Sequence, residues 1–474
     1  MRSIFLFILL ACTIIPMELS ASHTIGGELT YICTGVNQFE VTYKFYRDCT
    51  GISAPLDVTL ISTSSCYPSV NLILDPTAWS PLPVTTTCPS ASTSCNGGVY
   101  AGIELWVYTG ILTLPGLCTD WRFGVSVCCR NVAITTSDTA SSSNIYTECL
   151  LNNQDAICNN SPVFTDDPYP FGCVGQKSCF SNEAYDADGD SLSYRLIEPK
   201  TTATLTLLYN PPYSGTQPVL SSPPAQMNSL TGEFCTYPTQ PDVSVYAIQV
   251  SEYRNGILIG QIERDIQFRI INCSNIPPTL SGLNGTSGFN ATLCVGTSYD
   301  FSIYSSDPDI GQNTNIQWNW GINTASFVSY GSARDSAHFI WTPTLSDVNT
   351  NPHCFVAKVS DDNCPYFANA SAYYCFTVID SSDILCGNVS VAEEIVPPLV
   401  RIYTSTGLNV YNLEWNSFAG FTSLQVYDAA GRLLVDENVS SHSISSINLE
   451  NLSRGIYYVY LRGKDYWSKS LVRH

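Results

Sequence analysis

The sequence has little charge, few basic residues and few of the side chains that bind transition metals. Only 13% of its 474 residues are charged, and 40 Asp and Glu outnumber 20 Lys and Arg. A net charge of −20 leaves no basic stripe to meet phosphates, which argues against nucleic-acid binding. Five histidines and the absence of any Cys-x-x-Cys pair argue against zinc and iron–sulfur sites.

Long apolar runs and enzyme motifs are also missing. After the first 20 residues no apolar stretch approaches the ~18 residues of a spanning helix, so we expect no transmembrane segment in the mature chain. The sequence contains no Gly-x-Ser-x-Gly, no His-Glu-x-x-His and no glycine-rich phosphate loop. We therefore expect a protein that is not an enzyme. A secreted hydrolase remains the alternative, because a catalytic triad or a carboxylate pair can assemble from distant residues.

The residues that are abundant favour strands and turns. The chain is rich in Ser, Thr, Tyr and Val, and it holds 30 Gly and 27 Pro. In one stretch Phe39, Val41, Tyr43 and Phe45 alternate with polar residues, which is typical of a half-buried strand. We predict an all-β chain of several domains, built as tandem Ig-like or cadherin-like β-sandwiches behind a disulfide-rich N-terminal region.

The first 22 residues read as a secretory signal peptide. Arg2 precedes an apolar run from Ile4 to Ile15, and small residues follow at positions 20–22. An alternative is a lipobox at residues 9–12, which would make Cys12 a lipid anchor. Export exposes the other 19 cysteines to an oxidising compartment, so disulfides are expected. The adjacent Cys128 and Cys129 would bond different partners if they lay on a strand, where side chains alternate.

Three motifs stand out in the N-terminal region. They are His23-x-x-Gly26-Gly27-Glu28, Tyr46-Arg47-Asp48-Cys49 and Cys128-Cys129-Arg130-Asn131. With the segment at residues 161–176, this region resembles the N-terminal module of large surface proteins from gliding Bacteroidetes. That family has no known biochemical activity, so the resemblance implies a surface location and gliding-related architecture only.

Two middle segments share one order of features: an acidic loop, strands, and a strand that ends in Val-Ser-acid. The first loop holds Asp186, Asp188 and Asp190 around a glycine, and the second holds Asp307 and Asp309. The order resembles cadherin-like and Ig-like sandwich modules of bacterial surface proteins. Carboxylates spaced by two residues can point oxygens at one Ca²⁺ ion, so both loops are candidate calcium sites. We expect Asp166 or Asp167 to complete the first shell, and Asp361 or Asp362 the second; a solvated acidic turn is the alternative.

Two tryptophans in the third predicted domain suggest a further possibility. Trp318 and Trp320 share one strand face and could stack on sugar rings, although a β-sandwich commonly buries a Trp in its core. We favour the core interpretation. A surface glycan or protein ligand remains open.

The last 75 residues differ in composition from the rest. They contain no cysteine, and their seven basic and six acidic residues give a net charge of +1. The segments VYDAAGRLL (426–434), INLENLSRGIYYVYL (447–461) and KSLVRH (469–474) resemble the type A C-terminal sorting domain of the type IX secretion system of Bacteroidetes. The matching motif residues are Gly431, Arg432, Gly455, Ile456, Tyr457 and Lys469. The usual Tyr-Pro-Asn-Pro opening is absent, because residues 402–407 read IYTSTG.

These observations predict a domain order and a role. We expect a signal peptide at 1–22, a disulfide-rich domain at 23–160, sandwiches at 161–275 and 276–385, a linker at 386–399 and a sorting domain at 400–474. The resemblance implies the type IX machinery as a partner and a secreted or outer-surface location. The role we favour is adhesion or gliding-related surface architecture, without catalysis.

Overall fold

The computed structural model describes most of the chain. The described residues are 24–84, 87–168, 171–348, 352–383, 386, 400–404, 410–415, 421–428, 432–439, 444–449, 452–463 and 466–473. The predicted signal peptide with Cys12, His23, the bulk of the linker and Gly431 lie outside them. The chain forms two compact units, one holding most described residues up to Ile379 and the other those from Asp380 onward.

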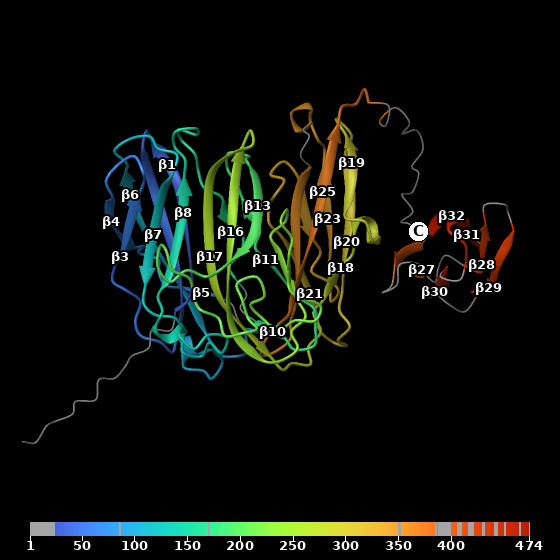
Figure 1. Cartoon of the computed structure of the whole chain (residues 1–474), viewed down its shortest axis with the longest axis horizontal. Helices are drawn as coiled ribbons and strands as arrows, with labels where there is room; N and C mark the ends of the chain where they lie inside the picture. Colours follow the sequence, from blue (N-terminus) through green and yellow to red (C-terminus); the bar gives the residue numbers. More distant parts are fainter. Residues whose placement is uncertain are drawn as a thin grey trace, which may run out of the picture. The chain divides into compact units, whose positions relative to one another are not determined.

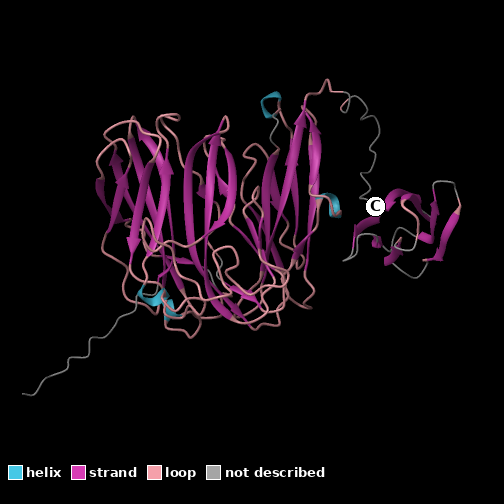
Figure 2. Cartoon of the chain, in the orientation of Figure 1, coloured by secondary structure: helices cyan, strands magenta, loops and turns pink. Residues whose placement is uncertain are grey.

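The described residues are almost entirely strands and loops, as predicted (Figure 2). Their only helical pieces are four short 3-10 turns: η1 (Ser94–Asn96), η2 (Ala140–Ser142), η3 (Leu283–Gly285) and η4 (Leu345–Asp347). None of the described residues forms a helix with the length and hydrophobicity that a membrane crossing requires.

A twelve-stranded sheet dominates the first unit (Figure 1). Its strands are β1 (Thr24–Gly35), β2 (Gln38–Asp48), β3 (Val58–Thr63), β4 (Val70–Pro76), β5 (Leu82–Val84), β6 (Ile103–Thr113), β7 (Trp121–Val127), β8 (Ile145–Leu151), β10 (Phe171–Cys173), β13 (Ser191–Ile197), β16 (Asp242–Arg254) and β17 (Ile257–Ile271).

Strand β17 joins the two halves of this sheet. One edge of β17 pairs with β16, and the other edge pairs in turn with β8 at residues 260–262, β1 at 264–266 and β10 at 269–271. The pairings β1-β2-β6-β4-β3-β7-β8-β17-β1 therefore close a ring around an apolar core. We predicted a domain boundary at residues 160/161, but strands from both sides of it share this sheet. Sequence periodicity identifies strands without showing which distant strands they pair with.

The N-terminal motifs lie where the ring closes. Gly26 and Gly27 pair with Ile266 and Asp265, and a Cβ at Gly26 would lie only 2.3 Å from the Asp265 carbonyl oxygen. Glu28 is buried and its Oε2 accepts a hydrogen bond from Arg264 Nε at 2.5 Å. The two glycines thus permit the close approach of β1 and β17, and the ion pair neutralises a buried charge.

Arg130 of the third motif has a matching role. Its guanidinium donates two hydrogen bonds to the carboxylate of Asp265, at 2.7 and 2.6 Å, and both side chains are buried. Asn131 from the same motif donates to Asp48 at 3.4 Å. The motif residues therefore form one structural cluster around the ring closure.

Two small sheets pack against β16 and β17. They are β9 (Val163–Phe164) with β12 (Ala184–Tyr185), and β11 (Ser178–Ser181) with β15 (Glu233–Thr236) and β14 (Gln226–Met227). Phe180 and Phe234 from the second of these pack with Tyr246 and Phe268 in a separate apolar core.

Residues 279–379 form an Ig-like sandwich of two four-stranded sheets. One sheet contains β18 (Thr279–Leu280), β20 (Tyr299–Ser306), β23 (Ser336–Trp341) and β22 (Ser326–Ser329). The other contains β19 (Asn290–Cys294), β25 (Asn369–Ile379), β24 (His353–Asp361) and β21 (Thr314–Trp318). Trp341 is buried between them, as a sandwich core requires.

The second unit is also a small sandwich. Its sheets contain β26 (Val400–Thr404), β27 (Val410–Trp415) and β30 (Ile444–Asn448), and β29 (Leu433–Asn438), β28 (Phe421–Asp428), β31 (Gly455–Gly463) and β32 (Tyr466–Arg473). The segments 426–434 and 447–461, which carry the sorting-domain resemblance, contribute to β28, β29, β30 and β31. Leu424, Val426, Val459 and Leu461 are part of its core.

Disulfides staple the first unit. The pairs are Cys33–Cys158, Cys49–Cys95, Cys66–Cys118, Cys88–Cys364, Cys128–Cys129, Cys173–Cys273, Cys179–Cys235 and Cys354–Cys375. Cys149 is free and buried. The expectation that Cys128 and Cys129 bond different partners was wrong. They follow the end of β7 at Val127, so strand alternation does not separate their side chains.

Candidate functional site

The first acidic loop brings three carboxylates together. Asp186 follows β12, Asp190 precedes β13, and Glu252 lies on β16, whose pairing with β13 sets Glu252 opposite Leu192. One oxygen of each carboxylate lies within 4.8 Å of the others. The loop and the strand register therefore build one acidic cluster, which we define as Asp186, Asp190 and Glu252.

The hydrogen bonds of the cluster leave two oxygens unused. Asp186 Oδ1 accepts from the backbone N–H groups of Asp188 (3.0 Å) and Asp190 (2.9 Å), which fixes the turn. Asp186 Oδ2 and Glu252 Oε1 are buried and have no hydrogen-bond partner in the described structure. The two residues are only 8% and 0% exposed, so water does not replace the missing partners easily.

Among the described residues, Arg254 brings positive charge to one side of the cluster. Arg254 donates to Asp190 at 2.8 and 2.6 Å, and to Asn159 Oδ1 at 2.8 Å. Asn159 in turn donates to Glu252 Oε2 at 2.9 Å. With Asp188 counted, four carboxylates face one guanidinium, so full ionisation would leave three uncompensated negative charges.

The titration behaviour reflects this imbalance. Burial and the charge of Asp186 raise the pKa of Glu252 to about 9. Burial raises the pKa of Asp186 as well, with help from Asp190 and Asp188. Burial opposes ionisation at Asp190 too, but the hydrogen bonds from Arg254 hold its pKa below the usual value. A proton on Glu252, or a cation beside Asp186 and Glu252, would therefore relieve the imbalance.

The sequence-predicted triplet is only partly assembled. Asp186 and Asp190 join the cluster, whereas the carboxylate of Asp188 accepts from the backbone and side chain of Asn160, at 2.8 and 2.9 Å. Glu252 was missed, because it lies 66 positions after Asp186 and only strand pairing reveals its proximity. Asp166 and Asp167, expected to complete the shell, instead line a cleft with residues of β24.

The second acidic loop faces the segment that precedes the Ig-like sandwich. Asp309 accepts from the backbone of Ile276 at 2.7 Å, and Asp361 accepts from Asn275 at 2.8 Å. Burial and the nearby charge of Asp307 raise the pKa of Asp361, although hydrogen bonds to it act in the opposite direction. Asp307 Oδ2 is buried without a partner in the described structure. Asp307 and Asp361 are therefore close, while Asp309 is used as a structural acceptor.

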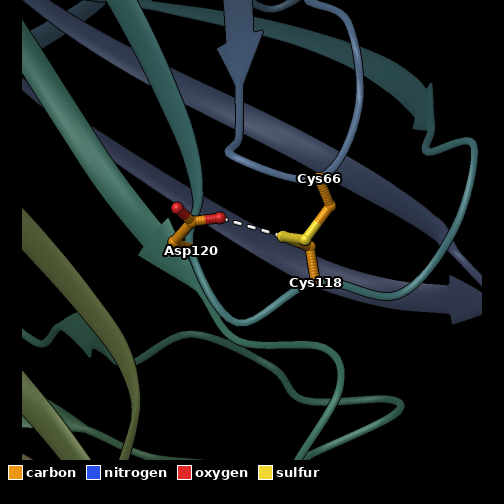
Figure 3. Close-up of side chains that lie close together, drawn as sticks. All are labelled: Cys66, Cys118 and Asp120. Atoms are coloured by element: carbon orange, nitrogen blue, oxygen red, sulfur yellow. Dashed lines mark hydrogen bonds between the residues drawn. A yellow bond between two sulfur atoms is a disulfide. The ribbon is translucent and has the colours of Figure 1, made fainter.

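Two other groups of potential ligands are disulfide-bonded. Cys66, Cys118 and Asp120 lie together, but a sulfur–sulfur bond joins the two cysteines (Figure 3). Cys179 and Cys235, beside Glu233, are bonded in the same way. A disulfide sulfur is neither a thiolate ligand nor a proton donor, so these groups are structural.

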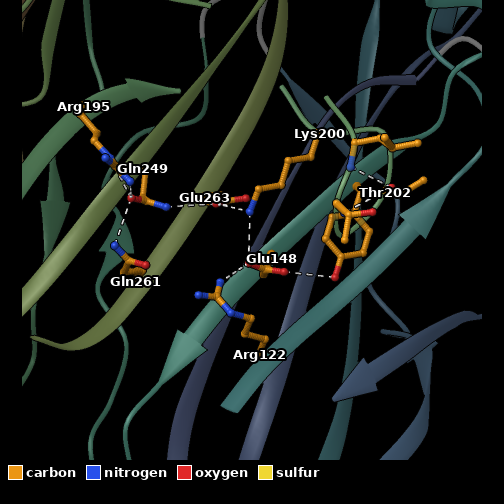
Figure 4. Close-up of polar contacts among 11 residues, drawn as sticks. Arg122, Glu148, Arg195, Lys200, Thr202, Gln249, Gln261 and Glu263 are labelled. Atoms are coloured by element: carbon orange, nitrogen blue, oxygen red, sulfur yellow. Dashed lines mark hydrogen bonds and ion pairs between the residues drawn. The ribbon is translucent and has the colours of Figure 1, made fainter. Parts of the chain in front are cut away.

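A charged network crosses the large sheet (Figure 4). Lys200 Nζ lies 3.1 Å from Glu148 and 2.8 Å from Glu263, and Arg122 pairs with Glu148 at 2.5 Å. Glu263 also accepts from Gln249, to which Arg195 donates. Both glutamates are thus satisfied by cations and amides, which indicates cross-strand stabilisation rather than an acid–base pair.

One Asp–His–Ser set occurs on the Ig-like sandwich. Asp300 Oδ1 lies 2.8 Å from His338 Nδ1, and His338 Nε2 lies 3.4 Å from Ser302 Oγ. The three side chains stand on the outer face of β20 and β23, where the Asp300 side chain is 53% exposed and water competes for both hydrogen bonds. Such a set has the order of a triad but lacks the water-excluded setting that makes one effective.

The two tryptophans differ in environment. Trp318 packs against Phe327, Phe339 and Phe355, so it is a partly buried side chain at the edge of the sandwich core. Trp320 is 68% exposed, with its ring centroid 5.0 Å from that of Trp318. The core interpretation therefore holds for Trp318 and not for Trp320.

The sorting-motif residues occupy defined places in the second unit. Tyr457 is buried and its hydroxyl donates to the Ser453 carbonyl at 2.5 Å. Arg432 bonds Asp428 through its backbone and its guanidinium, at 2.9 and 3.1 Å. The backbone of β31 and β32 pairs Gly455 with Arg473, Ile456 with Val472 and Val459 with Lys469. The motif residues thus lie in two places: Arg432 at the connection of β28 and β29, and Gly455, Ile456, Tyr457 and Lys469 in the terminal β31-β32 hairpin.

Comparison with known proteins bears on this second unit. Residues 389–473 match the family described as the secretion system C-terminal sorting domain. No curated protein matches the chain.

Several solved structures align with low similarity. A Dpr2 Ig1–Ig2 structure, in complex with DIP-Theta, is 15% identical, with 46% of this chain and 99% of that chain covered and a TM-score of 0.21. The Sidekick-1 immunoglobulin domains 1–4 are 11% identical, with 90% and 93% covered and a TM-score of 0.18. The endo-fucoidan hydrolase MfFcnA4 is 15% identical, with 71% and 42% covered and a TM-score of 0.18. These TM-scores are far below 0.5, so the alignments carry no argument about function.

The sorting domain indicates the cellular location of the protein. A sorting domain of this family implies interaction with the type IX secretion machinery, so the protein is secreted or held at the outer cell surface.

Proposed function

We propose that the protein is a non-catalytic adhesion protein of the bacterial surface. The observation that carries the proposal is the combination of a C-terminal sorting domain with a disulfide-stapled, all-β first unit that includes an Ig-like sandwich. Rigid sandwiches with acidic loops suit display and binding. The polar clusters that resemble catalytic sites are either satisfied by internal partners or open to water.

A gliding-related role is the finer form of this proposal. It rests on the resemblance of the N-terminal motifs to surface proteins of gliding Bacteroidetes. In the structure Gly26, Gly27, Glu28 and Arg130 serve the closure of the large sheet. They are therefore a signature of the scaffold, and any ligand contact would come from other residues.

Attachment of the producing bacterium tests the proposal. A strain lacking the gene should attach less to glass and to its natural surface, and external addition of the purified mature protein should compete with wild-type attachment. Spreading on soft agar tests the gliding-related form separately. Normal attachment and normal spreading of the deletion strain would contradict both forms.

We also propose calcium as a structural ligand of the first unit. The supporting observation is the pair of buried, unpartnered oxygens on Asp186 and Glu252 beside Asp190. Ca²⁺ prefers several oxygen ligands at ~2.3–2.6 Å, and an ion there would remove most of the uncompensated charge. Asp307 and Asp361 offer a weaker second site of the same chemistry. Calorimetric titration of the mature protein with Ca²⁺ tests both, and the absence of binding heat at millimolar Ca²⁺ would refute them.

A further inference from the structure

The Ig-like sandwich contacts the rest of the first unit through the outer face of its β19-β25-β24-β21 sheet. Tyr373 on β25 donates to the Thr231 carbonyl at 2.6 Å, and Asn319 donates to Glu183 at 2.5 Å. The Cys88–Cys364 disulfide fastens the same junction, with the Cys88 N–H donating to the Pro365 carbonyl at 2.9 Å. The two parts are therefore held in a fixed relation.

A cleft of about 480 Å³ lies beside these contacts. Its walls come from the end of β5 and from residues 87–89, from residues 166–168, and from β21, β24 and β25. This volume falls within the ~300–1,000 Å³ of typical ligand sites. The disulfide residue Cys88 is part of the wall, so the staple that joins the two parts lies at the cleft itself.

Most of the acidic groups of the cleft are already engaged. Asp361 accepts from the N–H groups of Asn363 and Ala368 as well as from Asn275. Asp362 accepts from the backbone and side chain of Asn313, at 2.8 and 2.7 Å. Asp167 accepts from the Tyr46 hydroxyl at 3.0 Å.

The groups that remain for a ligand are mixed in character. Asp166 and Lys358 lie 3.9 Å apart, too far for a hydrogen bond, and their charges balance. Gln317 pairs with Lys358 across β21 and β24, and Ser360 follows on the same face. The side chains of Gln317 and Ser360 have no hydrogen-bond partner among the described residues. The groups that protein donors leave for a ligand are thus an ammonium, a carboxylate, an amide and a hydroxyl, while the engaged carboxylates of Asp167, Asp361 and Asp362 make the wall as a whole negative.

We propose that this cleft binds a neutral saccharide unit of a surface glycan. A sugar carries hydroxyls that both donate and accept, which matches the four available groups. Its C–H face can lie against the apolar side chains of Phe367, Pro83 and Pro168. A strongly anionic ligand would face the carboxylates of the wall. A cation would face the Lys358 ammonium and, among the described lining residues, a single carboxylate that protein donors do not engage. The proposal rests on the adhesion function and names its ligand class.

A glycan array probed with the labelled mature protein tests the ligand class. The array should carry neutral, acidic and amino oligosaccharides. We expect binding to neutral oligosaccharides, reduced at least tenfold by Lys358→Gln and by Gln317→Leu, because each removes one of the four groups. Lys177→Gln is the matched control, since Lys177 is exposed and does not line the cleft. Unchanged melting temperatures would show that the variants fold.

The other outcomes overturn the inference. Binding to acidic or amino saccharides only would refute the ligand class, and no binding to any saccharide would refute the site. Equal binding by wild type and both cleft variants would also refute it, as would a loss caused by Trp320→Ala, which would place the ligand on the exposed tryptophan. If the deletion strain attaches poorly and the Lys358→Gln protein restores attachment fully, adhesion stands and the cleft proposal fails.

Discussion

From the acidic cluster and its proposed calcium ion we predict that the stability of the first unit depends on pH and on calcium together. In the absence of metal the folded protein holds a proton on Glu252, whose pKa is raised to about 9. The unfolded chain releases that proton near pH 4.3. Because the folded state binds more protons in this window, the free energy of unfolding falls as pH rises from about 4.3 towards 9, by up to ~1.4 kcal/mol per pH unit.

The Glu252→Gln substitution should remove this component. The amide keeps the size of the side chain but carries no charge, so in chelator the variant should lose stability less steeply between pH 5 and 8. Ca²⁺ should flatten the wild-type profile, because the ion replaces the proton. At 100 times its dissociation constant Ca²⁺ adds ~2.7 kcal/mol, which raises the melting temperature of a unit of about 350 residues by ~4 °C.

Denaturant unfolding at several pH values, with chelator or with millimolar Ca²⁺, measures both effects. Glu198→Gln is the control, because Glu198 is exposed and outside the cluster. Asp188→Asn should retain the calcium effect, since Asp188 is bound to Asn160. Parallel pH profiles of wild type and Glu252→Gln in chelator would refute the proton account. A profile that Ca²⁺ does not change would refute the metal account.

Three further predictions concern the scaffold. Glu28→Gln leaves buried Arg264 uncompensated and should lower the free energy of unfolding, measured with denaturant, by about 3–5 kcal/mol. Arg432→Gln, in an exposed pair, should change the free energy of unfolding of the sorting domain by under about 1 kcal/mol. Equally small effects of both substitutions would contradict the role of burial. Gly26→Ala should lower the melting temperature clearly, because the new Cβ meets the Asp265 carbonyl oxygen at 2.3 Å, while Gly35→Ala on the same strand has its nearest neighbour at 3.7 Å and should be neutral. Thiol labelling without reductant should modify no cysteine of the native mature protein and only Cys149 after unfolding; a second reactive thiol would contradict the disulfide pattern.

The sequence predicted the strand content and the sorting domain well, because both depend on local patterns. Alternation over Phe39 to Phe45 corresponds to the buried face of β2, and the segments that resemble the sorting domain lie in the strands of the second unit. The sheet that joins residues before and after position 160 could not be predicted, since it depends on the successive pairing of β8, β1 and β10 with one edge of β17.

The candidate sites show the same limit. Asp186 and Asp190 were found from their spacing, but Glu252 enters through the register of β13 with β16, which no local pattern reveals. Asp188 was expected to point with its neighbours and instead accepts from Asn160. The cleft depends on Asp166 and Lys358, nearly 200 residues apart, and on a disulfide between Cys88 and Cys364 that the sequence did not indicate.

Truncation of the C-terminal unit tests the central claim most directly. A strain producing residues 1–399 should retain the protein in the periplasm, while the full chain reaches the cell surface or the medium. Residues 386–474 fused to a reporter with a signal peptide should carry that reporter out of the cell. Cell fractionation and protease accessibility of intact cells provide the measurement. Normal arrival of the truncated protein at the surface would contradict the account.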